Sequence, residues 1–392
     1  MGKERERDVI IVGAGPAGAT TAALLAQKGY DVLILDRHDF PRDKACGDGI
    51  PAGAIEIMLR LGMKDKIDKA VERGEFYRVN SVRILSPKGK MLRAPLTEGK
   101  EGGKSYVAPR LYFDAVIQEQ AVESGAEFRK ALVKEPLIED GRVVGVQAQL
   151  NGDVKELRSK MVVGADGVTS AITRGLRPSE GQHTDVHRAV ALRAYITDLE
   201  EIEREVEFYL YDEILPGYAW IFPAGNGKSN IGLGMRLDIF RKNNHNLKDM
   251  LQDFLDLPQI KPRLKRGGEI EGVKIWQLNF GSQKKLQHTF DGAILVGDAA
   301  GFINPLTGGG IHNALISANY AGQTINEALQ KGDTSRESLK IYEKLCQDAM
   351  WKGMRRSFFI QRWLLRFPAI ADVFFANAGE DGALAKTFLE KL

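Results

Sequence analysis

The first forty residues alternate between short apolar runs and glycine-rich turns. Residues 9–12 form an uninterrupted β-branched run, which is typical of a strand buried on both faces of a parallel sheet. Residues 19–27 have the composition of a helix, and Gly29 follows as its stop signal. Residues 32–35 form a second buried run that closes on Asp36. The pattern therefore predicts a strand–helix–strand unit at the start of the chain.

Three glycines link the first strand to the helix in the spacing G-x-G-x-x-G. Gly13 permits a tight turn, Gly15 lets the backbone approach a pyrophosphate, and Gly18 lets the helix pack closely on the strand. Asp36 stands 18 residues after Gly18, where its carboxylate can accept hydrogen bonds from an adenosine ribose. Because an acid there disfavours a 2′-phosphate, the unit predicts a site for FAD or NAD rather than NADP.

Two further apolar runs end near an aspartate. One leads into Ala-Asp-Gly around Asp166, and the run at 293–296 leads to Asp298, a loop, three glycines and a helix. A carboxylate at the end of a strand can bind a ribityl hydroxyl. A helix that opens near Gly310 can aim its N–H groups and positive dipole at a flavin edge. Each segment taken separately is also compatible with a plain strand-to-helix turn.

Period-two alternation marks residues 76–104 and 186–284. Together with their hairpin turns it predicts a mainly antiparallel sheet inserted into the first domain. Tyr218, Trp220 and Phe222 alternate and are expected on one face of a strand. Two interpretations of that face stay open: the wall of a hydrophobic tunnel, and an ordinary sheet core.

The last part of the chain, 336–392, is predicted to be helical and is rich in large apolar residues and arginines. Aromatic residues such as Phe359 and Trp363 stand among the arginines. One interpretation is a set of helices that cap the inserted sheet. The other is a membrane-surface helix that helps to deliver a lipid.

Composition narrows the class of protein. A length of 392 residues with 43% hydrophobic residues favours two domains or slightly more. The net charge of +3, without a long basic run, argues against a nucleic-acid partner. Cys46 and Cys346 form neither a disulfide framework nor a paired-cysteine zinc site, so we expect no metal and a cytoplasmic setting. No apolar run reaches the roughly 18 residues of a membrane span, so any membrane contact is expected to be peripheral.

These motifs resemble those of the flavoprotein superfamily of p-hydroxybenzoate hydroxylase and, within it, the geranylgeranyl reductase family. The likeness runs from about residue 8 to about residue 330 and rests on the glycine motif with Asp36, the segment around Asp166, and the segment from Asp298 to Ile311. Two stretches point to the reductases: PRDKACGDG, and GYAWIFPAGNGKSNIGLG at 217–234, which is similar to the family's Tyr-x-Trp-x-Phe-Pro segment. The aromatic hydroxylases usually have a histidine where this chain has Gly301.

The resemblance implies a fold and a set of site residues. The expected fold is a discontinuous Rossmann-type FAD domain (1–75, 105–185 and 285–335), an inserted antiparallel β-sheet substrate domain (76–104 and 186–284) and a C-terminal helical segment (336–392). The expected substrate residues are Tyr218, Trp220 and Phe222. The expected cofactor-binding residues are Gly13, Gly15, Ala17, Gly18, Asp36, Arg37, Lys44, Cys46, Gly49, Arg110, Asp166, Asp298, Gly310 and Ile311.

Cys46 lies in the loop that the resemblance places alongside the flavin. Gly47 and Gly49 suit a backbone pressed near a flat ring, where side chains would clash. Three roles are considered for Cys46: a redox disulfide with Cys346, a catalytic acid or modulator near flavin N5, and a small polarizable wall of the pocket. The disulfide is the least favoured, because Cys346 belongs to a separate segment. Lys44 is expected either to neutralise charge on the cofactor or to be a solvated lysine.

The resemblance implies an FAD-dependent reductase that saturates carbon–carbon double bonds of a geranylgeranyl chain on a diphosphate, lipid, quinone or pigment. The electron donor would be NAD(P)H, a small protein such as ferredoxin, or a quinol. His312, at the start of the predicted helix, is either a proton donor or a structural histidine. Two alternatives stay open: a flavin monooxygenase or halogenase of the same fold, and a non-catalytic flavin-bound lipid carrier.

Overall fold

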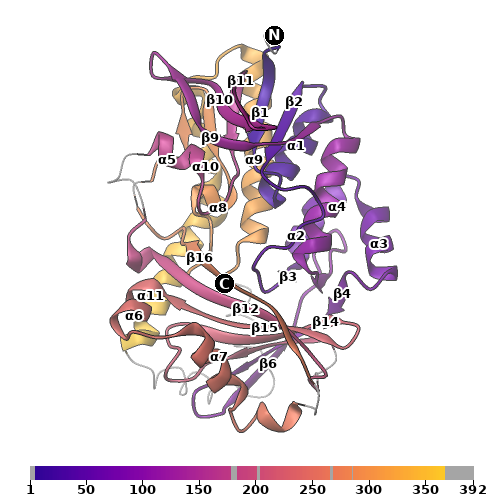
Figure 1. Ribbon diagram of the computed structural model, residues 1–392, viewed down its shortest axis with the longest axis vertical. Helices are drawn as coiled ribbons and strands as arrows, with labels where there is room; N and C mark the ends of the chain where they lie inside the picture. Colours follow the sequence, from indigo (N-terminus) through magenta and orange to yellow (C-terminus); the bar gives the residue numbers. More distant parts are fainter. Residues whose placement is uncertain (1–4, 178–182, 201–203, 265–267, 285, 367–392) are drawn as a thin grey trace.

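The computed structural model describes residues 5–177, 183–200, 204–264, 268–284 and 286–366. Two large sheets lie one above the other in Figure 1, with helices beside the strands of the upper sheet and below the lower sheet. The upper part carries the strands of the N-terminal unit, and the lower part carries the strands of the aromatic segment. The expected α/β class with a second, antiparallel sheet is therefore the one observed.

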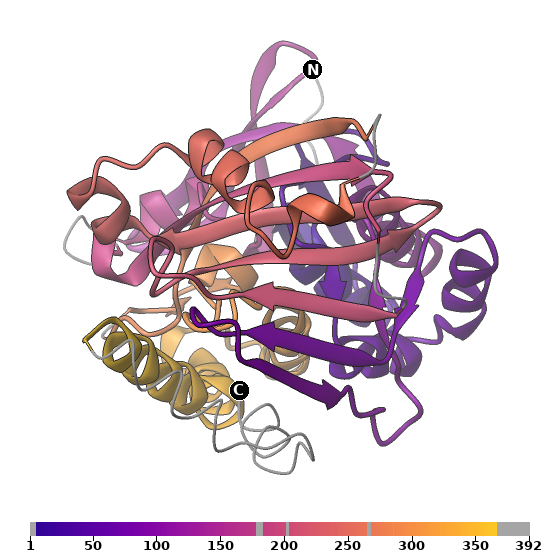
Figure 2. The ribbon, with the colours of Figure 1, turned by 90° about the horizontal axis from the view of Figure 1, so that it is seen from below.

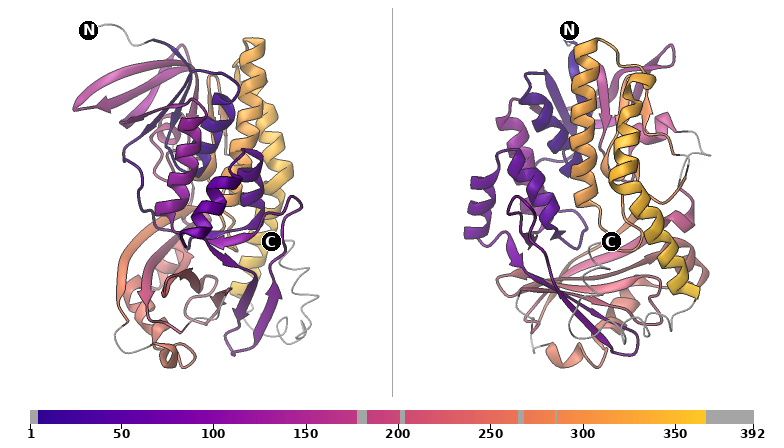
Figure 3. Two further views of the ribbon diagram at one scale, coloured as in Figure 1. Left: turned by 90° about the vertical axis from the view of Figure 1, so that its right-hand side faces the viewer. Right: turned by 180° about the vertical axis from the view of Figure 1, so that it is seen from behind.

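The upper sheet is built on parallel strands in the order β8-β2-β1-β11-β18, with β17 antiparallel at the edge. The core of this sheet includes β1 and β2, whose apolar side chains are almost fully buried, as the sequence pattern predicts. Strands β9 and β10 and the first half of β11 form an antiparallel meander on the opposite side of these strands from α9 (Figure 3, left). The strands of this sheet are β1 (Arg7–Val12), β2 (Val32–Asp36), β8 (Glu127–Lys130), β9 (Leu132–Glu139), β10 (Arg142–Leu150), β11 (Asp153–Gly164), β17 (Thr289–Phe290) and β18 (Ala293–Leu295).

The lower sheet runs in the order β16-β12-β15-β14-β13-β5-β6. Its pairs are antiparallel except for β13 and β5, which are parallel. Alternate residues of β12 face opposite ways, as the pleat requires. One set packs against α7, whose helix lies over the face seen from below in Figure 2, and the other set faces the upper part of the molecule. The strands are β5 (Ser81–Leu85), β6 (Met91–Pro95), β12 (Arg188–Thr197), β13 (Glu205–Tyr209), β14 (Tyr218–Gly225), β15 (Lys228–Arg236) and β16 (Ile270–Asn279).

A small sheet, β3-β7-β4, lies between the two large ones. It consists of β3 (Gly49–Ile50), β4 (Tyr77–Val79) and β7 (Ser105–Val107). Strand β4 comes from the predicted insertion at 76–104 but pairs with β7, whereas β5 and β6 join the lower sheet. The division into domains at the expected residues therefore stays a prediction.

Helices flank the upper sheet and close the back of the molecule. Helix α1 packs against α4 and α9. Helix α9 runs upward at the back of the molecule, and α10, η4 and α11 descend beside it (Figure 3, right). Residues 367–392 of the predicted helical segment lie outside the described residues. The helices are α1 (Pro16–Ala26), α2 (Ala52–Arg60), α3 (Lys64–Glu72), α4 (Arg110–Glu123), α5 (Ala171–Leu176), η2 (Asp185–His187), α6 (Leu237–Lys242), α7 (Leu247–Leu255), η3 (Lys261–Arg263), α8 (Gly297–Ala300), α9 (Ile311–Lys331), α10 (Arg336–Cys346), the π-helical η4 (Gln347–Trp351) and α11 (Lys352–Arg366).

Candidate active site

One continuous cavity of about 910 Å³ lies between the upper and lower sheets. Gly18 lies outside its lining: a Cβ there would meet the Gly13 carbonyl oxygen at 1.8 Å, so Gly18 serves the close packing of α1 on the turn. The other residues expected at the site are brought together along its walls. They are Gly13, Gly15, Ala17, Asp36, Arg37, Lys44, Cys46, Gly49, Arg110, Asp166, Tyr218, Trp220, Phe222, Asp298, Gly310 and Ile311.

The glycine turn points the start of α1 at the cavity. Gly13 has φ +101°, and a Cβ there would lie 2.4 Å from the Ala165 carbonyl oxygen, so only glycine fits. Gly15 is the N-cap of α1, and no side chain caps the helix. Because the first N–H groups of a helix lack partners within it, this end is suited to an anion. Asp36 at the end of β2 fixes the turn by accepting a 2.9 Å hydrogen bond from the Ala14 N–H.

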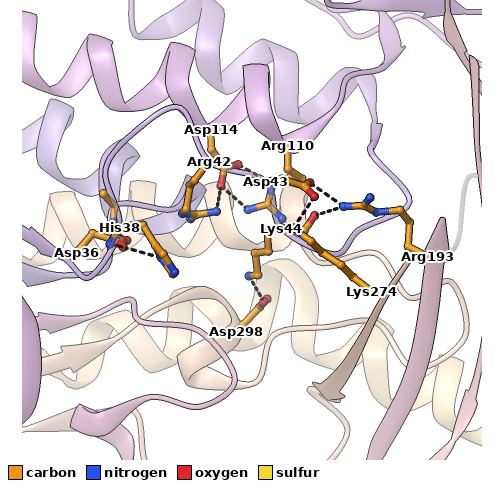
Figure 4. Close-up of polar contacts among 11 residues, drawn as sticks. Asp36, His38, Arg42, Asp43, Lys44, Arg110, Asp114, Arg193, Lys274 and Asp298 are labelled. Atoms are coloured by element: carbon orange, nitrogen blue, oxygen red, sulfur yellow. Dashed lines mark hydrogen bonds and ion pairs between the residues drawn. The ribbon is translucent and has the colours of Figure 1, made fainter. Parts of the chain in front are cut away.

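Ion pairs connect the loop after β2 to residues of the upper part of the molecule and to the lower sheet (Figure 4). Lys44 lies 3.1 Å from Asp298, so two residues that the sequence assigns to the cofactor site are paired with each other. Arg42 lies 3.0 Å from Asp114, which also holds Arg110 through two contacts of 2.5 and 2.7 Å. Burial alone would lower the pKa of the Arg110 guanidinium, but the Asp114 carboxylate raises it well above its ordinary value. Arg110 is therefore a fixed, buried positive charge.

Cys46 is half-buried in the cavity wall and is not in a disulfide; Cys346 is buried on α10 and is also free. Burial raises the pKa of the Cys46 thiol, and the nearby Arg110 charge offsets part of that rise. The thiol therefore keeps its proton at neutral pH. On either side of the next turn, a Cβ at Gly47 or Gly49 would lie 3.3 or 3.4 Å from a ring carbon of Phe222. The glycines thus let this backbone approach an aromatic side chain closely.

Asp166 and the start of α9 occupy the other side of the cavity. The Asp166 carboxylate accepts hydrogen bonds from the Ser170 hydroxyl and, at 2.6 Å, from the Ala171 N–H. These hydrogen bonds stabilise the turn that leads into α5. Burial raises the pKa of the Asp166 carboxyl. Gly310 is the N-cap of α9, again without a side-chain cap. A 21-residue helix thus directs its positive end toward the cavity.

The aromatic side chains of β14 form one face of the cavity. Trp220 and Phe222 are 6% and 7% exposed, and Tyr218 donates a hydrogen bond to the Thr307 carbonyl oxygen. The Tyr218 and Trp220 rings meet at 6.0 Å between centroids, and Phe208 of β13 packs edge-on against Phe222 at 5.2 Å. These residues belong to a sheet core and also line the cavity, and their role as the wall of a hydrophobic tunnel stays a prediction.

His312 lies in the first turn of α9 and lines the cavity. Burial lowers the pKa of its imidazole, and the Glu56 carboxylate offsets part of the change. The ring is therefore neutral at pH 7, which argues against an imidazolium as proton donor.

Sequence reasoning missed a second set of polar residues at the site. Asp43 accepts from Arg193 at 2.6 Å and pairs with Lys274 at 2.5 Å, which ties the loop to the lower sheet (Figure 4). Asp48 is completely buried in the lining of the cavity and accepts a hydrogen bond from the Tyr195 hydroxyl. Arg193 and Tyr195 stand two residues apart on β12, so the period-two pattern of the sequence places them on one face of the strand. No local pattern indicates that they bond to Asp43 and Asp48.

Comparison with known proteins decides the family. A model of the FAD binding domain matches residues 6–357. The digeranylgeranylglycerophospholipid reductase 2 of Methanopyrus kandleri is 34% identical over 359 residues, which cover 89% of this chain and 84% of that protein. The chain belongs to the geranylgeranyl reductase family of FAD-dependent oxidoreductases.

Solved structures agree with this family at the level of the fold. A geranylgeranyl bacteriochlorophyll reductase-like protein from Thermoplasma acidophilum matches with a TM-score of 0.84 at 25% identity, covering 99% of this chain and 100% of that one. A flavin-dependent brominase matches with a TM-score of 0.78 at 21% identity, over 97% and 93% of the two chains. The likeness to the brominase shows a shared fold only.

The cavity of this family member fits FAD on its own geometry. The uncapped start of α1 suits a diphosphate, and the Asp36 carboxylate lies at the end of β2 beside it. A Cβ on Gly15 would have Arg42 Nη2 at 3.5 Å as its nearest neighbour, so the missing side chain leaves room at the turn. Among the described residues, no cluster of three histidine, cysteine or acidic side chains could hold a metal. None of the described helices is long and apolar enough to cross a membrane.

Proposed function

We propose that the chain saturates carbon–carbon double bonds in the geranylgeranyl chains of a glycerophospholipid. The observation that carries this proposal is the continuity of the cavity. The start of α1, the Cys46 turn and the aromatic face of β14 all line one space. The curated relative from Methanopyrus kandleri is named for this substrate class, which supports the choice of lipid.

We assign the cofactor to the glycine turn, Asp36, the Cys46 turn and the start of α9. When bound and reduced, FAD would supply a hydride to one carbon of the double bond. The chain's own task is to hold an apolar chain in a dry slot beside the ring. Trp220 and Phe222 contribute an apolar wall, because both side chains are almost fully buried and the partly buried Phe208 packs edge to face against Phe222.

The second carbon of the double bond needs a proton, and we assign its delivery to Cys46. Its thiol lines the cavity and stays protonated because burial raises its pKa. The backbone N–H of Asp48 lies 3.3 Å from Sγ and can stabilise the thiolate that remains. One hydride and one proton are thus consumed for each double bond. The donor that reduces the cofactor, NAD(P)H or a small electron-transfer protein such as ferredoxin, remains part of the proposal.

The test is an anaerobic single turnover. The yellow protein is reduced with dithionite, freed of excess reductant and mixed with a digeranylgeranyl phospholipid, while flavin absorbance and product mass are followed. The proposal predicts reoxidation with a gain of two hydrogens per flavin. A flavin that stays reduced until oxygen enters, with oxygen or halogen then added to the product, would establish the monooxygenase or halogenase alternative. Lipid that binds without any reoxidation would favour the carrier.

We also propose that the outer face of α11 touches a membrane surface. Phe359 and Trp363 are 70% and 56% exposed and stand four residues apart, so they share one face of the helix. Arg356 and Arg362 are exposed on the same helix and suit anionic head groups. This face offers a place where a lipid substrate enters the protein.

A further inference from the structure

The backbone at Asp48 is held in an uncommon conformation beside Cys46. Asp48 has φ +62°, a left-handed value that few residues other than glycine, asparagine and aspartate adopt. Its N–H points at Cys46 Sγ over 3.3 Å, and its carbonyl oxygen accepts a 2.9 Å hydrogen bond from the Ala108 N–H. Both backbone groups of Asp48 thus help to hold the turn that carries Cys46.

The Asp48 side chain fastens this turn to the lower sheet. Its Oδ2 accepts hydrogen bonds from the Tyr195 hydroxyl at 2.5 Å and from Asn230 Nδ2 at 2.7 Å. Asn230 Nδ2 also donates to the Cys46 carbonyl oxygen at 2.8 Å. On its other atom, Asn230 Oδ1 accepts from Trp220 Nε1 at 2.8 Å. A single buried carboxyl therefore links the Cys46 turn to the indole in the cavity wall.

Sheet register explains why these groups meet. Tyr195, Asn230 and Phe222 lie opposite one another on β12, β15 and β14. Their side chains therefore form one row across the sheet, and the Asp48 carboxyl bonds to two of them. The neighbouring glycines of the turn rest against the third, Phe222.

We propose that Asp48 is a positioning residue of the active site, which sets the place of the Cys46 thiol and the Trp220 indole relative to one another. This role needs no contact between Asp48 and the reacting atoms. It acts through Asn230 and the backbone of the turn. This inference rests on the proposed function for its effect on turnover, but not for its effect on Trp220.

The charges around Asp48 suit a carboxyl that can hold a proton. Burial raises its pKa to about 6, while hydrogen bonds from Tyr195 and Asn230 and the charges of Arg193 and Arg110 limit the rise. Its Oδ1 is buried without a hydrogen-bond partner, which suits a protonated oxygen. Oδ2 can accept the same two hydrogen bonds in either form, so the positioning contacts do not need the negative charge.

The test compares two substitutions at Asp48. Asp48→Ala removes the contacts, whereas Asp48→Asn keeps an acceptor oxygen and tolerates the left-handed backbone. We expect turnover of geranylgeranyl phospholipid to fall about 100-fold in Asp48→Ala and about threefold in Asp48→Asn, since small displacements of catalytic groups have effects of this size. Tyr195→Phe removes one donor and is expected to cost about tenfold. Asp140→Ala is the control, because Asp140 has φ +48° in an exposed turn outside the cavity.

A second readout follows Trp220 without any substrate. The ¹⁵N-labelled indole N–H signal, assigned with Trp220→Phe, should shift in Asp48→Ala and stay in place in Asp48→Asn and Asp140→Ala. Should Asp48→Ala fail to fold, a shift of the same signal in Tyr195→Phe carries the test. An unshifted indole signal with unchanged turnover would overturn the proposal. So would an Asp48→Asn protein as inactive as Asp48→Ala with its indole in place, because the charge rather than the position would then be required.

The two proposals fail in different ways. If wild-type protein reduces no prenyl lipid, the proposed function is wrong, and the indole signal alone decides whether Asp48 positions Trp220. If wild-type protein reduces the lipid and the Asp48 variants match it, only the positioning role is wrong.

Discussion

At the scale of a single residue, Cys46 is the side chain to which we assign delivery of the proton that accompanies the hydride. It is set by a turn whose glycines approach an aromatic ring, and its thiol is kept protonated by burial. The stretch around it is visible in the sequence, and so is the need for glycine beside a flat surface. Asp48 stands in the same stretch, but its partners Tyr195 and Asn230 are 147 and 182 residues away. No local pattern can predict such contacts, because only the sheet register brings those side chains under the turn.

Replacing Cys46 tests its role as proton donor. We expect Cys46→Ala to lower kcat about 100-fold while FAD and lipid still bind, since a lost general acid typically costs at least that much. Steady-state kinetics under anaerobic conditions, with flavin content measured on the same sample, check the result. Cys346→Ala is the matched control, because that thiol is buried on α10 and does not line the cavity. Full activity in Cys46→Ala would reduce Cys46 to a wall of the pocket.

Asp48 should also make the free energy of unfolding depend on pH. Burial raises its pKa from the ordinary 3.8 to about 6 in the folded protein, so the folded state holds the proton more tightly. Its contribution to the free energy of unfolding is therefore greatest below pH 4 and falls by about 3 kcal/mol as the pH rises through 6.

Urea unfolding of wild type and Asp48→Asn between pH 4 and 8 checks this sign. The variant has no titrating group at this position, so the wild type should lose stability relative to it across the window. Parallel curves for the two proteins would show that folding does not raise the pKa of Asp48.

At the scale of elements, the apolar runs predict β1, β2 and β18 well because strands buried on both faces leave a continuous signal. Helix α1 begins at Pro16, three residues before the predicted start, since proline is tolerated in the first turn of a helix. A loop was expected directly after Asp298, but Asp298 lies inside one turn of helix, α8, which continues to Ala300. Helix α7 was absent from the expected sheet region, although Leu247, Met250, Leu251 and Phe254 carry the helical spacing.

The start of α1 offers a test that separates folding from cofactor binding. Gly15 has φ −72°, and a Cβ there would have its nearest neighbour at 3.5 Å, so Gly15→Ala should cost at most about 1 kcal/mol of stability. A methyl group at the point where a diphosphate approaches should nevertheless weaken FAD binding by about tenfold to 100-fold. Fluorescence titration of the apoprotein with FAD measures this. Gly353→Ala on α11, which has open space around it, is the control. Equal FAD affinities for the two variants would show that the diphosphate does not bind at this turn.

At the scale of the whole molecule, the sequence indicates both the FAD unit and the antiparallel sheet, but not the way they enclose a common cavity. The ion pairs that join them, Asp43 with Lys274 and Asp43 with Arg193, link residues that are far apart in the chain. The family resemblance supplied the expectation that the aromatic face lies near the flavin site. In the structure the glycine turn and the aromatic face of β14 line one cavity, a result that the pattern of residues alone does not predict.

The exposed face of α11 makes a prediction about membranes. Phe359→Ser with Trp363→Ser should reduce sedimentation with anionic phospholipid vesicles by about tenfold, because two large apolar side chains no longer enter the interface. Ile341→Ser on α10, also at an exposed apolar position, is the control. Unchanged sedimentation of the double variant would place membrane contact elsewhere or remove it.

The central claim is that one cavity holds both the cofactor and the prenyl chain. The most direct test is a crystal structure of the protein with FAD and the product phospholipid, in which every double bond of the two former geranylgeranyl chains has been reduced. This lipid cannot react further. The account predicts the flavin ring between the Cys46 turn and the start of α9, with an alkyl chain along Trp220 and Phe222. An alkyl chain bound outside this cavity, or a flavin ring that covers the β14 face and leaves no room for a chain, would contradict it.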